Sequence, residues 1–445
     1  MKFINTIKNI WKIEELKNRI LVTLGLLLVY RFGAQIVLPG IDASQLSNLA
    51  NQTDSGLLGL LNAFTGGAFS NASVFALGIM PYISASIVVQ LMGIAIPYLQ
   101  KLQKEGESGR RKINQITRWL TIAITLVQGP GYIYNLFATL PQGAFLLGDT
   151  ITFVASSVVI LTTGTIFAMW LGEKITDKGI GNGISLLIMV GIIARLPLAF
   201  MQEFASRVFE SNGGLIMILI ELVIWFAIIM ASVMLVMAVR QIPVQYARRS
   251  ASGGYEKNVF GSRQYIPLKL NASGVMPIIF AQAIMFIPMA VVGLSDSDTA
   301  QGIATAFSDI FGFWYNVVFA LLIIIFTYFY TAITVPTNKM ADDLKRSGGF
   351  IPGIRPGSET AEFLDRVMSQ ITLPGSIFLA LIAVFPAIVV SLLGVQQGWA
   401  LFFGGTSLLI MVGVAIDTMQ QVNSYLLNRH YDGLMKSGKN RKAVA

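Results

Sequence analysis

The sequence predicts an all-α, polytopic membrane protein with ten transmembrane helices. Hydrophobic residues make up 54% of the 445 residues and charged residues only 12%, about half the charged share of a typical soluble domain. Ten apolar segments can cross the roughly 30 Å hydrocarbon core as helices, the shorter ones with help from flanking residues. They cover residues 20–38, 74–96, 119–134, 151–171, 184–200, 215–239, 272–293, 314–335, 373–393 and 400–416.

The distribution of basic residues predicts the topology. Every Lys and Arg except Arg31, Arg195 and Arg207 lies at a terminus or in every second connection between the apolar segments. The positive-inside rule places these parts, and both termini, in the cytoplasm, so the number of spans is even. The net charge of +9 therefore reflects topology and a cytoplasmic surface suited to anionic lipid, RNA or acidic protein.

Ten spans divide into two groups of five, which predicts two inverted halves. An odd number of spans in each half starts the second half on the opposite side of the membrane, and a pathway would then lie between the halves. The predicted parts are an amphipathic cytoplasmic segment, the two halves and a basic cytoplasmic tail, with cytoplasmic loops 240–270 and 337–371 in the second half. Their bounds are 1–19, 20–204, 214–421 and 422–445.

The composition argues against an enzyme or a metal centre. The sequence has no cysteine and a single histidine, His430, which disfavours thiol chemistry and a His-based metal or proton relay. Residues 433–440, GLMKSGKN, have the spacing of a phosphate-binding loop. They end in Asn and follow no strand, so we expect no nucleotide site there. We expect no catalytic residue, no cofactor and no metal.

Few ionisable residues lie inside the predicted spans. They are Arg31, Glu221 and, near the end of the last span, Asp417. Such residues either belong to a proton or ion path, or snorkel to the interface or contact another subunit. They do not form the cluster that a transporter of ions or polar solutes needs.

Three basic loops share the predicted cytoplasmic side. Residues 104–112 are dense in charge, and residues 246–269 place a Gly-Gly pair between short polar arms, which predicts a protruding hairpin. Residues 347–360 hold Gly and Pro that would stiffen a loop around Arg355. Each loop alone is typical of a solvated surface, whereas three loops on one face favour a docking surface.

Two short patterns have a structural and a functional interpretation. Residues 55–73 hold an apolar run of about eight residues, too short to span, which predicts either a re-entrant half-helix or an amphipathic surface turn. Ile79 and Ile83, like Ile184 and Ile188, are four residues apart and share a helix face. Such isoleucines normally face lipid or a neighbouring helix, but a ring of them would make a gate.

Six segments of the sequence closely resemble the SecY family, the channel subunit of the bacterial protein translocase. They are FALGIMPYISASIVVQL, KEGESGRRK, MWLGEKITDKGIGNGIS, IPLKLNASGVMP, FIPGIRPG and FGGTSLLIMVGVAIDTMQQV. The matching blocks run in family order from Arg31 to about Asn423. The resemblance implies ten helices in a clamshell of two inverted halves. The implied function is a channel that passes unfolded secretory proteins across the membrane and releases membrane proteins laterally into it.

The resemblance also implies four sets of site residues. The pore ring would consist of Ile79, Ile83, Ile184, Ile188, Ile279 and Ile410. A plug at 57–68 would include Leu57, Leu58, Leu60, Leu61, Phe64, Gly66 and Gly67. The lateral gate would contain Ser84, Gln90, Asn271 and Ile287. The sites that dock the motor or the ribosome would include Arg248, Arg249, Lys257, Arg263 and Arg355.

The implied location is the bacterial cytoplasmic (inner) membrane, with multiple passes. The implied partners are the SecE and SecG small membrane subunits, the SecA motor ATPase, the ribosome, signal sequences, unfolded polypeptides and membrane lipid.

An apolar ring would let any unfolded sequence pass and offers ions no replacement for their hydration shell. Two other functions predict different behaviour. A secondary transporter of small solutes needs a polar site at the midplane, and a structural scaffold would conduct nothing.

Overall fold

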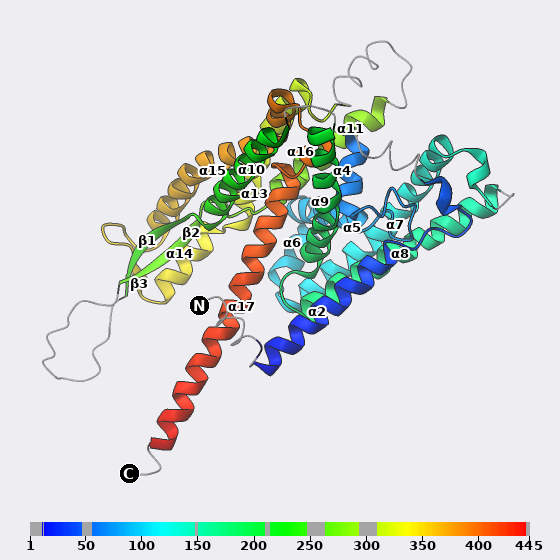
Figure 1. The fold of residues 1–445 in the computed structure, drawn as a ribbon. Coiled ribbons are helices and arrows are strands. Elements are labelled where there is room, and N and C mark those ends of the chain that lie inside the picture. The colour runs from blue at the N-terminus through cyan, green and yellow to red at the C-terminus, as the bar shows by residue number, and fades with distance from the viewer. Residues whose placement is uncertain are drawn as a thin grey trace, which may run out of the picture. The chain divides into compact units, whose positions relative to one another are not determined.

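The computed structural model describes residues 11, 13–46, 56–146, 150–209, 214–246, 263–292 and 309–441, and this part of the chain is mostly helical (Figure 1). The chain divides into two compact units. Unit 1 comprises Met1–Asn212, Gln396–Leu401 and Val414–Ala445, and unit 2 comprises Gly213–Val395 and Phe402–Gly413.

Each of the ten predicted apolar segments contains a helix. Among the described residues, six helices are long and apolar enough to cross a membrane, and a bent pair, Met80–Gly93 and Pro97–Gln103, makes a seventh if it is one span. The six are Thr150–Lys178, Gly183–Phe209, Gly214–Met237, Phe313–Arg346, Ser358–Leu393 and Gln397–Leu426. The chain is therefore a mostly helical polytopic membrane protein, and the number of ten spans stays a prediction.

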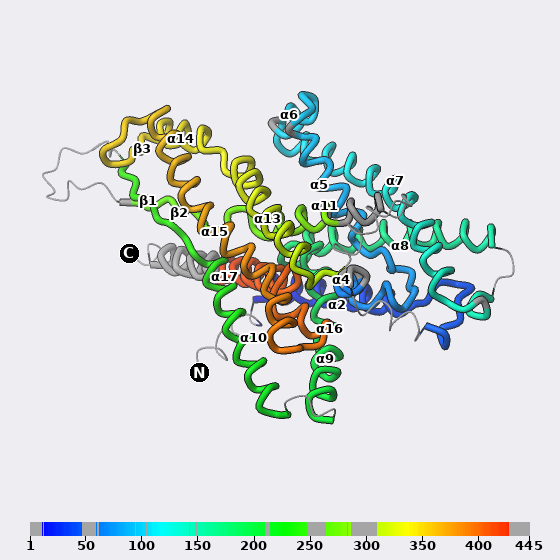
Figure 2. The backbone as a smooth tube through the Cα atoms, turned by 90° about the horizontal axis from the view of Figure 1, so that it is seen from above, coloured from blue at the N-terminus to red at the C-terminus, as the bar shows by residue number. Residues whose placement is uncertain are grey.

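Unit 1 is a helical bundle in which neighbours in sequence pack on one another. Its elements are α2 (Glu14–Gly33), η1 (Ala43–Gln45), α4 (Gly56–Thr65), α5 (Met80–Ala95), α6 (Pro97–Lys104), α7 (Glu107–Thr139), η2 (Gln142–Ala144), α8 (Thr150–Lys178), α9 (Gly183–Phe209) and α16 (Gln397–Ala400). Helix α7 packs on α5 and α8, and α8 packs on α9 (Figure 2). The predicted N-terminal segment lies largely outside the described residues.

A proline separates α5 from α6 at the end of the second apolar segment, residues 74–96. Ile96, which joins α5 to α6, has the extended angles φ −100° and ψ 116°, because the ring of Pro97 disfavours the helical region for the residue before it. Pro97 then begins α6, where its missing N–H needs no partner. The two helices meet at 102°, and α6 packs on α7.

Unit 2 combines long apolar helices with a small sheet. Its elements are α10 (Gly214–Met237), β1 (Val239–Tyr246), β2 (Arg263–Lys269), α11 (Met276–Val292), α13 (Phe313–Thr334), α14 (Thr337–Arg346), β3 (Gly349–Phe350) and α15 (Ser358–Leu393). Helix α13 packs on α15 and on α11. The last helix, α17 (Gly405–Arg441), begins in unit 2 and continues in unit 1 through the predicted basic tail.

A three-stranded antiparallel sheet shows that the all-α prediction was wrong in unit 2. The strand order is β2-β1-β3, beside α14 and one end of α15 (Figure 1). Alternate residues of β1, Ile242 and Val244, are buried against Leu344 of α14 and Leu364 of α15. This packing stabilises β1, whose own sequence, VRQIPVQY, has no apolar run and carries a proline inside the strand. The predicted hairpin exists, but its first arm is residues 239–246.

Candidate functional site

Four of the predicted pore-ring isoleucines lie in unit 1, on α5 and α9. Ile79 is the N-cap of α5 and follows Gly78, whose φ of +53° is the left-handed conformation that favours glycine. The N–H of Ile83 donates to the carbonyl of Ile79 at 3.1 Å, so the pair shares one face as its spacing predicted. Ile79 and Ile188 are buried, whereas Ile83 and Ile184 are partly exposed.

The other two predicted ring residues lie in unit 2. Ile279 is near the start of α11 and partly exposed, and Ile410 of α17 is buried. The six isoleucines are thus divided between the two units, and their closure into one ring stays a prediction.

The predicted plug forms α4 and the turn that follows it. Phe64 is buried, and α4 packs on α9, so this segment is a buried short helix and not a surface turn. Gly66 and Gly67 have φ of +66° and +89°, which only glycine adopts readily. The structure does not describe the side chains of Leu57, Leu58, Leu60 and Leu61.

Arg31 of α2 holds the turn after α4. Its Nη1 donates a hydrogen bond of 2.9 Å to the carbonyl of Gly66, 35 residues away. The turn also meets α9, because a Cβ on Gly66 would lie 2.6 Å from Arg31 Nη1 and 2.7 Å from the Cα of Gly191. A Cβ on Gly191 would lie 2.7 Å from the carbonyl oxygen of Phe64. This internal contact differs from the roles expected for Arg31, which were an ion path, snorkelling to the interface or contact with another subunit.

Side chains continue to support the turn beyond Gly67. Asn62 Oδ1 accepts from the N–H of Ser70 at 3.1 Å, and Thr65 Oγ1 accepts from the N–H of Phe69 at 3.2 Å. The hydroxyl of Tyr132, on α7, donates to the carbonyl of Phe69 at 2.8 Å. The segment that leads from the predicted plug to Ile79 is therefore fixed to the bundle at several points.

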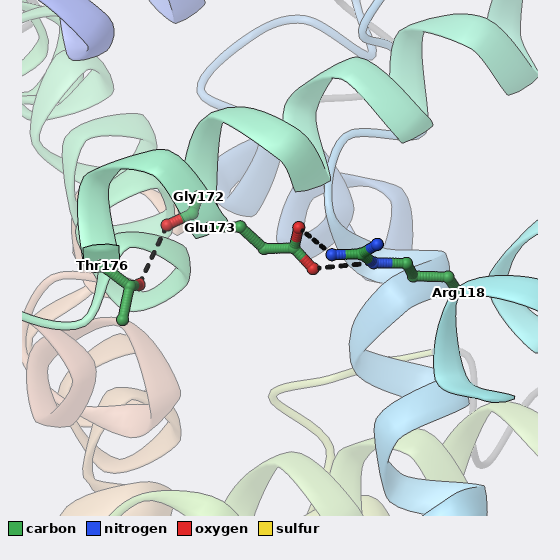
Figure 3. A network of polar contacts seen from close by, with 4 residues as sticks. All are labelled: Arg118, Gly172, Glu173 and Thr176. Carbon is green, nitrogen blue, oxygen red and sulfur yellow. Dashed lines mark hydrogen bonds and ion pairs between the residues drawn. The ribbon is translucent and has the colours of Figure 1, made fainter. Parts of the chain in front are cut away.

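A threonine bridge connects α8 to α9, the helix of Ile184 and Ile188. Thr176 Oγ1 donates to the carbonyl of Gly172 at 2.9 Å (Figure 3) and accepts from the N–H of Gly183 at 2.9 Å. A Cβ on Gly172 would lie 2.8 Å from Cγ1 of Ile184, so glycine there lets α9 begin against α8. The bridge sets the position of α9 relative to α8.

The predicted lateral-gate residues are also divided between the units. Ser84 and Gln90 are partly buried on α5, where Gln90 Nε2 donates to Ser86 Oγ at 3.3 Å. Asn271 is buried in unit 2, and its Oδ1 accepts from Ser273 Oγ at 3.3 Å. The structure does not describe the side chain of Ile287, the fourth predicted residue. Their role as a gate stays a prediction.

The sheet of unit 2 brings two of the three basic loops together. Strand β3, beside the loop of Arg355, pairs with β1 of the hairpin. The Arg355 side chain is 87% exposed, and its backbone carbonyl accepts from Thr360 Oγ1 at 2.8 Å. Gly353 and Gly357 on either side have φ of +85° and +117°, so glycine is needed to shape this loop.

The hairpin's other predicted docking residues lie mostly beyond the described part. Arg248, Arg249 and Lys257 lie outside the described residues. Arg263 begins β2, but the structure does not describe its side chain. Docking at the hairpin stays a prediction.

The structure also contains a buried ion pair that sequence reasoning missed. The predicted spans leave Arg207 between residues 200 and 215, outside any helix, but it lies in the last turn of α9, with its Nε 2.7 Å from Oε1 of Glu203. The two side chains are only 7% and 2% exposed. Oε2 of Glu203 accepts from the N–H of Gln396, 193 residues away, at 2.9 Å. The Glu-Arg spacing of four residues was the available signal.

Comparisons with known proteins agree on one family. The SecY family model matches residues 73–419, more than half of the chain. The chain is 41% identical to a protein translocase subunit SecY of Streptomyces scabiei over 436 residues, which cover 96% of this chain and 98% of that one.

Two solved structures are similar in fold. One is a protein conducting channel, with a TM-score of 0.59, 17% identity and 92% of both chains covered. The other is Sec61 in a canine ribosome-channel complex from the endoplasmic reticulum, with a TM-score of 0.54, 16% identity and the same coverage.

Proposed function

Because the chain belongs to the SecY family, we propose that it is the central protein-conducting channel of the Sec translocase. It passes unfolded secretory proteins across the cytoplasmic membrane and releases membrane proteins laterally into it. The family match over nearly the whole chain is the observation that carries this function. The protein is a channel and not an enzyme, so the movement is driven by a partner ATPase, ribosomal synthesis or the proton-motive force.

The proposed architecture is ten transmembrane helices in two inverted halves of five. A helix in each of the ten apolar segments and the division of the chain into two units support it. The alternation of basic and nearly base-free connections supports cytoplasmic termini in a multi-pass protein. The pathway then lies between the halves, as in other membrane proteins built from inverted repeats.

The narrowest part of the pathway is a ring of six isoleucines. Four of them lie on α5 and α9, and the other two on α11 and α17. An unfolded polypeptide presents every type of side chain, so any polar grip would delay some sequences. An apolar constriction forms no such bonds and resists wetting, which limits ion leakage around the moving chain.

The plug closes this ring from outside when no polypeptide is present. The burial of α4 against α9, the helix of Ile184 and Ile188, supports that position. A lateral gate beside Ser84, Gln90, Asn271 and Ile287 lets apolar signal sequences enter lipid. Each buried CH₂ favours this transfer by about 0.8 kcal/mol.

The partners follow from the surfaces of the chain and from the family. SecA and the ribosome dock on the cytoplasmic sheet and loops of unit 2, which the exposure of Arg355 supports. A similar fold occurs in a ribosome-channel complex. SecE and SecG, the small membrane subunits, complete the complex in the bacterial cytoplasmic membrane.

The test uses the absence of cysteine from the chain. A single cysteine replaces Ile83, and a second is placed in a secretory precursor that is stalled during translocation. We expect a disulfide between them that requires both the motor ATPase and the signal sequence. The matched control is Val159→Cys on α8, whose side chain is 63% exposed and which the proposal places outside the pathway.

Each outcome of the cross-linking is informative. A disulfide at position 83 and none at position 159 supports passage through the ring. If Ile83→Cys and Ile279→Cys both fail to form the disulfide while the motor still binds the complex, the channel proposal is wrong. Saturable uptake of a small solute would then support the transporter.

A further inference from the structure

We propose that Arg31 is the residue that holds the plug closed. This inference rests on the proposed function, because it assigns a role to a contact of the proposed plug. The contact is the 2.9 Å hydrogen bond from Arg31 Nη1 to the carbonyl of Gly66. It joins α2, which belongs to the surrounding bundle, to the turn that ends α4.

Besides the Arg31 bond, the turn itself packs on α9, and the Tyr132 hydroxyl of α7 holds the chain only further on, at the carbonyl of Phe69. Gly66 and Gly191 meet without side chains, at a spacing that leaves no room for a Cβ on either one. Such contacts are individually weak and have little directional preference. The Arg31 bond is directional and has a charged donor, which makes it about twice as strong as a bond between neutral groups.

Arg31 is fixed to the bundle by the aromatic residue before it in the sequence. Tyr30 is 1% exposed and stacks on Phe75 with ring centroids 5.5 Å apart. Phe75 in turn stacks on Phe167 of α8 at 6.0 Å. Because this stack positions the α2 backbone, the guanidinium is presented to Gly66 from a fixed helix.

The acceptor explains how the contact can be reversible. Arg31 donates to a neutral carbonyl and not to a carboxylate, so breaking the bond leaves only one charge without its partner. An intramembrane ion pair would leave two, and would hold the plug much more firmly. The Arg31 bond is therefore strong enough to favour the closed channel and weak enough to break when a signal sequence enters.

The experiment measures ion efflux from liposomes that contain the purified complex without a substrate. We expect Arg31→Gln to raise the leak about 10-fold or more, because a hydrogen bond from a charged donor is lost only from the closed state. Arg31→Lys keeps the charge without the planar fork of donors and should leak to an intermediate extent. The matched control, Arg19→Gln, removes a charge from the same helix and should not leak.

Deleting residues 57–67 separates this role from that of the plug. The deletion should leak by itself, and Arg31→Gln should add nothing to it. If the deletion leaks but Arg31→Gln in the intact chain does not, Arg31 does not hold the plug, although the plug itself is right. If the deletion does not leak, the plug assignment fails and the role of Arg31 fails with it.

A spin label reports the same contact without any measurement of flow. Asn71 is partly exposed, and its N–H donates to the carbonyl of Gly67 at 3.0 Å. A label on Asn71→Cys therefore reports on this turn without replacing a glycine of positive φ, and the chain has no other cysteine. Arg31→Gln should increase the mobility of this label, whereas Arg19→Gln should not. Unchanged mobility in a correctly assembled Arg31→Gln complex would overturn the inference.

Discussion

Arg118 and Glu173 form a two-point ion pair between α7 and α8. Nε of Arg118 lies 3.0 Å from Oε1 of Glu173, and Nη2 lies 2.5 Å from Oε2 (Figure 3). Glu173 precedes Thr176 by one helical turn, so the pair and the threonine bridge hold the same end of α8. The two contacts together position the start of α9, where Ile184 and Ile188 lie.

The Arg118–Glu173 pair should contribute little to stability by itself. Its side chains are 50% and 26% exposed, and exposed pairs are typically worth no more than about 1 kcal/mol. We expect Glu173→Gln to lower the free energy of unfolding by that amount or less, with a smaller difference at high salt. Unfolding of the purified protein in detergent at two salt concentrations measures this. A loss above about 2 kcal/mol would mean that lipid or detergent shields the pair from water.

The buried Glu203–Arg207 pair should behave differently. Glu203→Gln removes the charge of the carboxylate that lies 2.7 Å from the buried guanidinium of Arg207, and breaking a buried pair in this way costs about 3–5 kcal/mol. The same unfolding measurement gives the comparison with Glu173→Gln. The double variant, in which Gln also replaces Arg207, should recover part of the loss, because both buried charges are then removed. Equal losses for the single and double variants would contradict this explanation.

The threonine bridge between α8 and α9 depends on one hydroxyl. Thr176→Val keeps the shape but loses the bonds to Gly172 and Gly183, so we expect a loss of about 1–2 kcal/mol. Thr176→Ser keeps the hydroxyl and should be close to the original protein. Hydrogen exchange at the N–H of Gly183 should accelerate in the Val variant alone. If Thr176→Val is as stable as the original protein, the bridge contributes nothing to stability.

The helices could be predicted from the sequence, but the sheet could not be predicted completely. Runs of apolar residues identify segments that must be helical in lipid, and each of the ten contains a helix. Strand β1 follows the end of α10 almost directly and has no apolar run of its own. It is stabilised by residues such as Leu344 and Leu364, about 100 or more positions away in the chain.

The candidate site could be predicted residue by residue, but its contacts could not. The spacing of Ile79 and Ile83 correctly predicted a shared helix face, as the hydrogen bond between them confirms. The hydrogen bond from Arg31 to Gly66 joins residues 35 positions apart, and no local period connects them. In the sequence, Arg31 is therefore an isolated charge within a span. Only the fold brings the turn after α4 beside it.

Arg355 provides the sharpest test of the docking surface. Its side chain is 87% exposed, and its only described ion pair, with Glu359, is a long one of 3.7 Å, so Arg355→Glu should not measurably change unfolding. We expect it to reduce motor-driven translocation about 10-fold or more, because it reverses a charge where an acidic partner surface would dock. Arg366→Glu on α15, 68% exposed, is the matched control and should translocate normally. Equal defects in both variants would indicate general electrostatics instead of a specific site at Arg355.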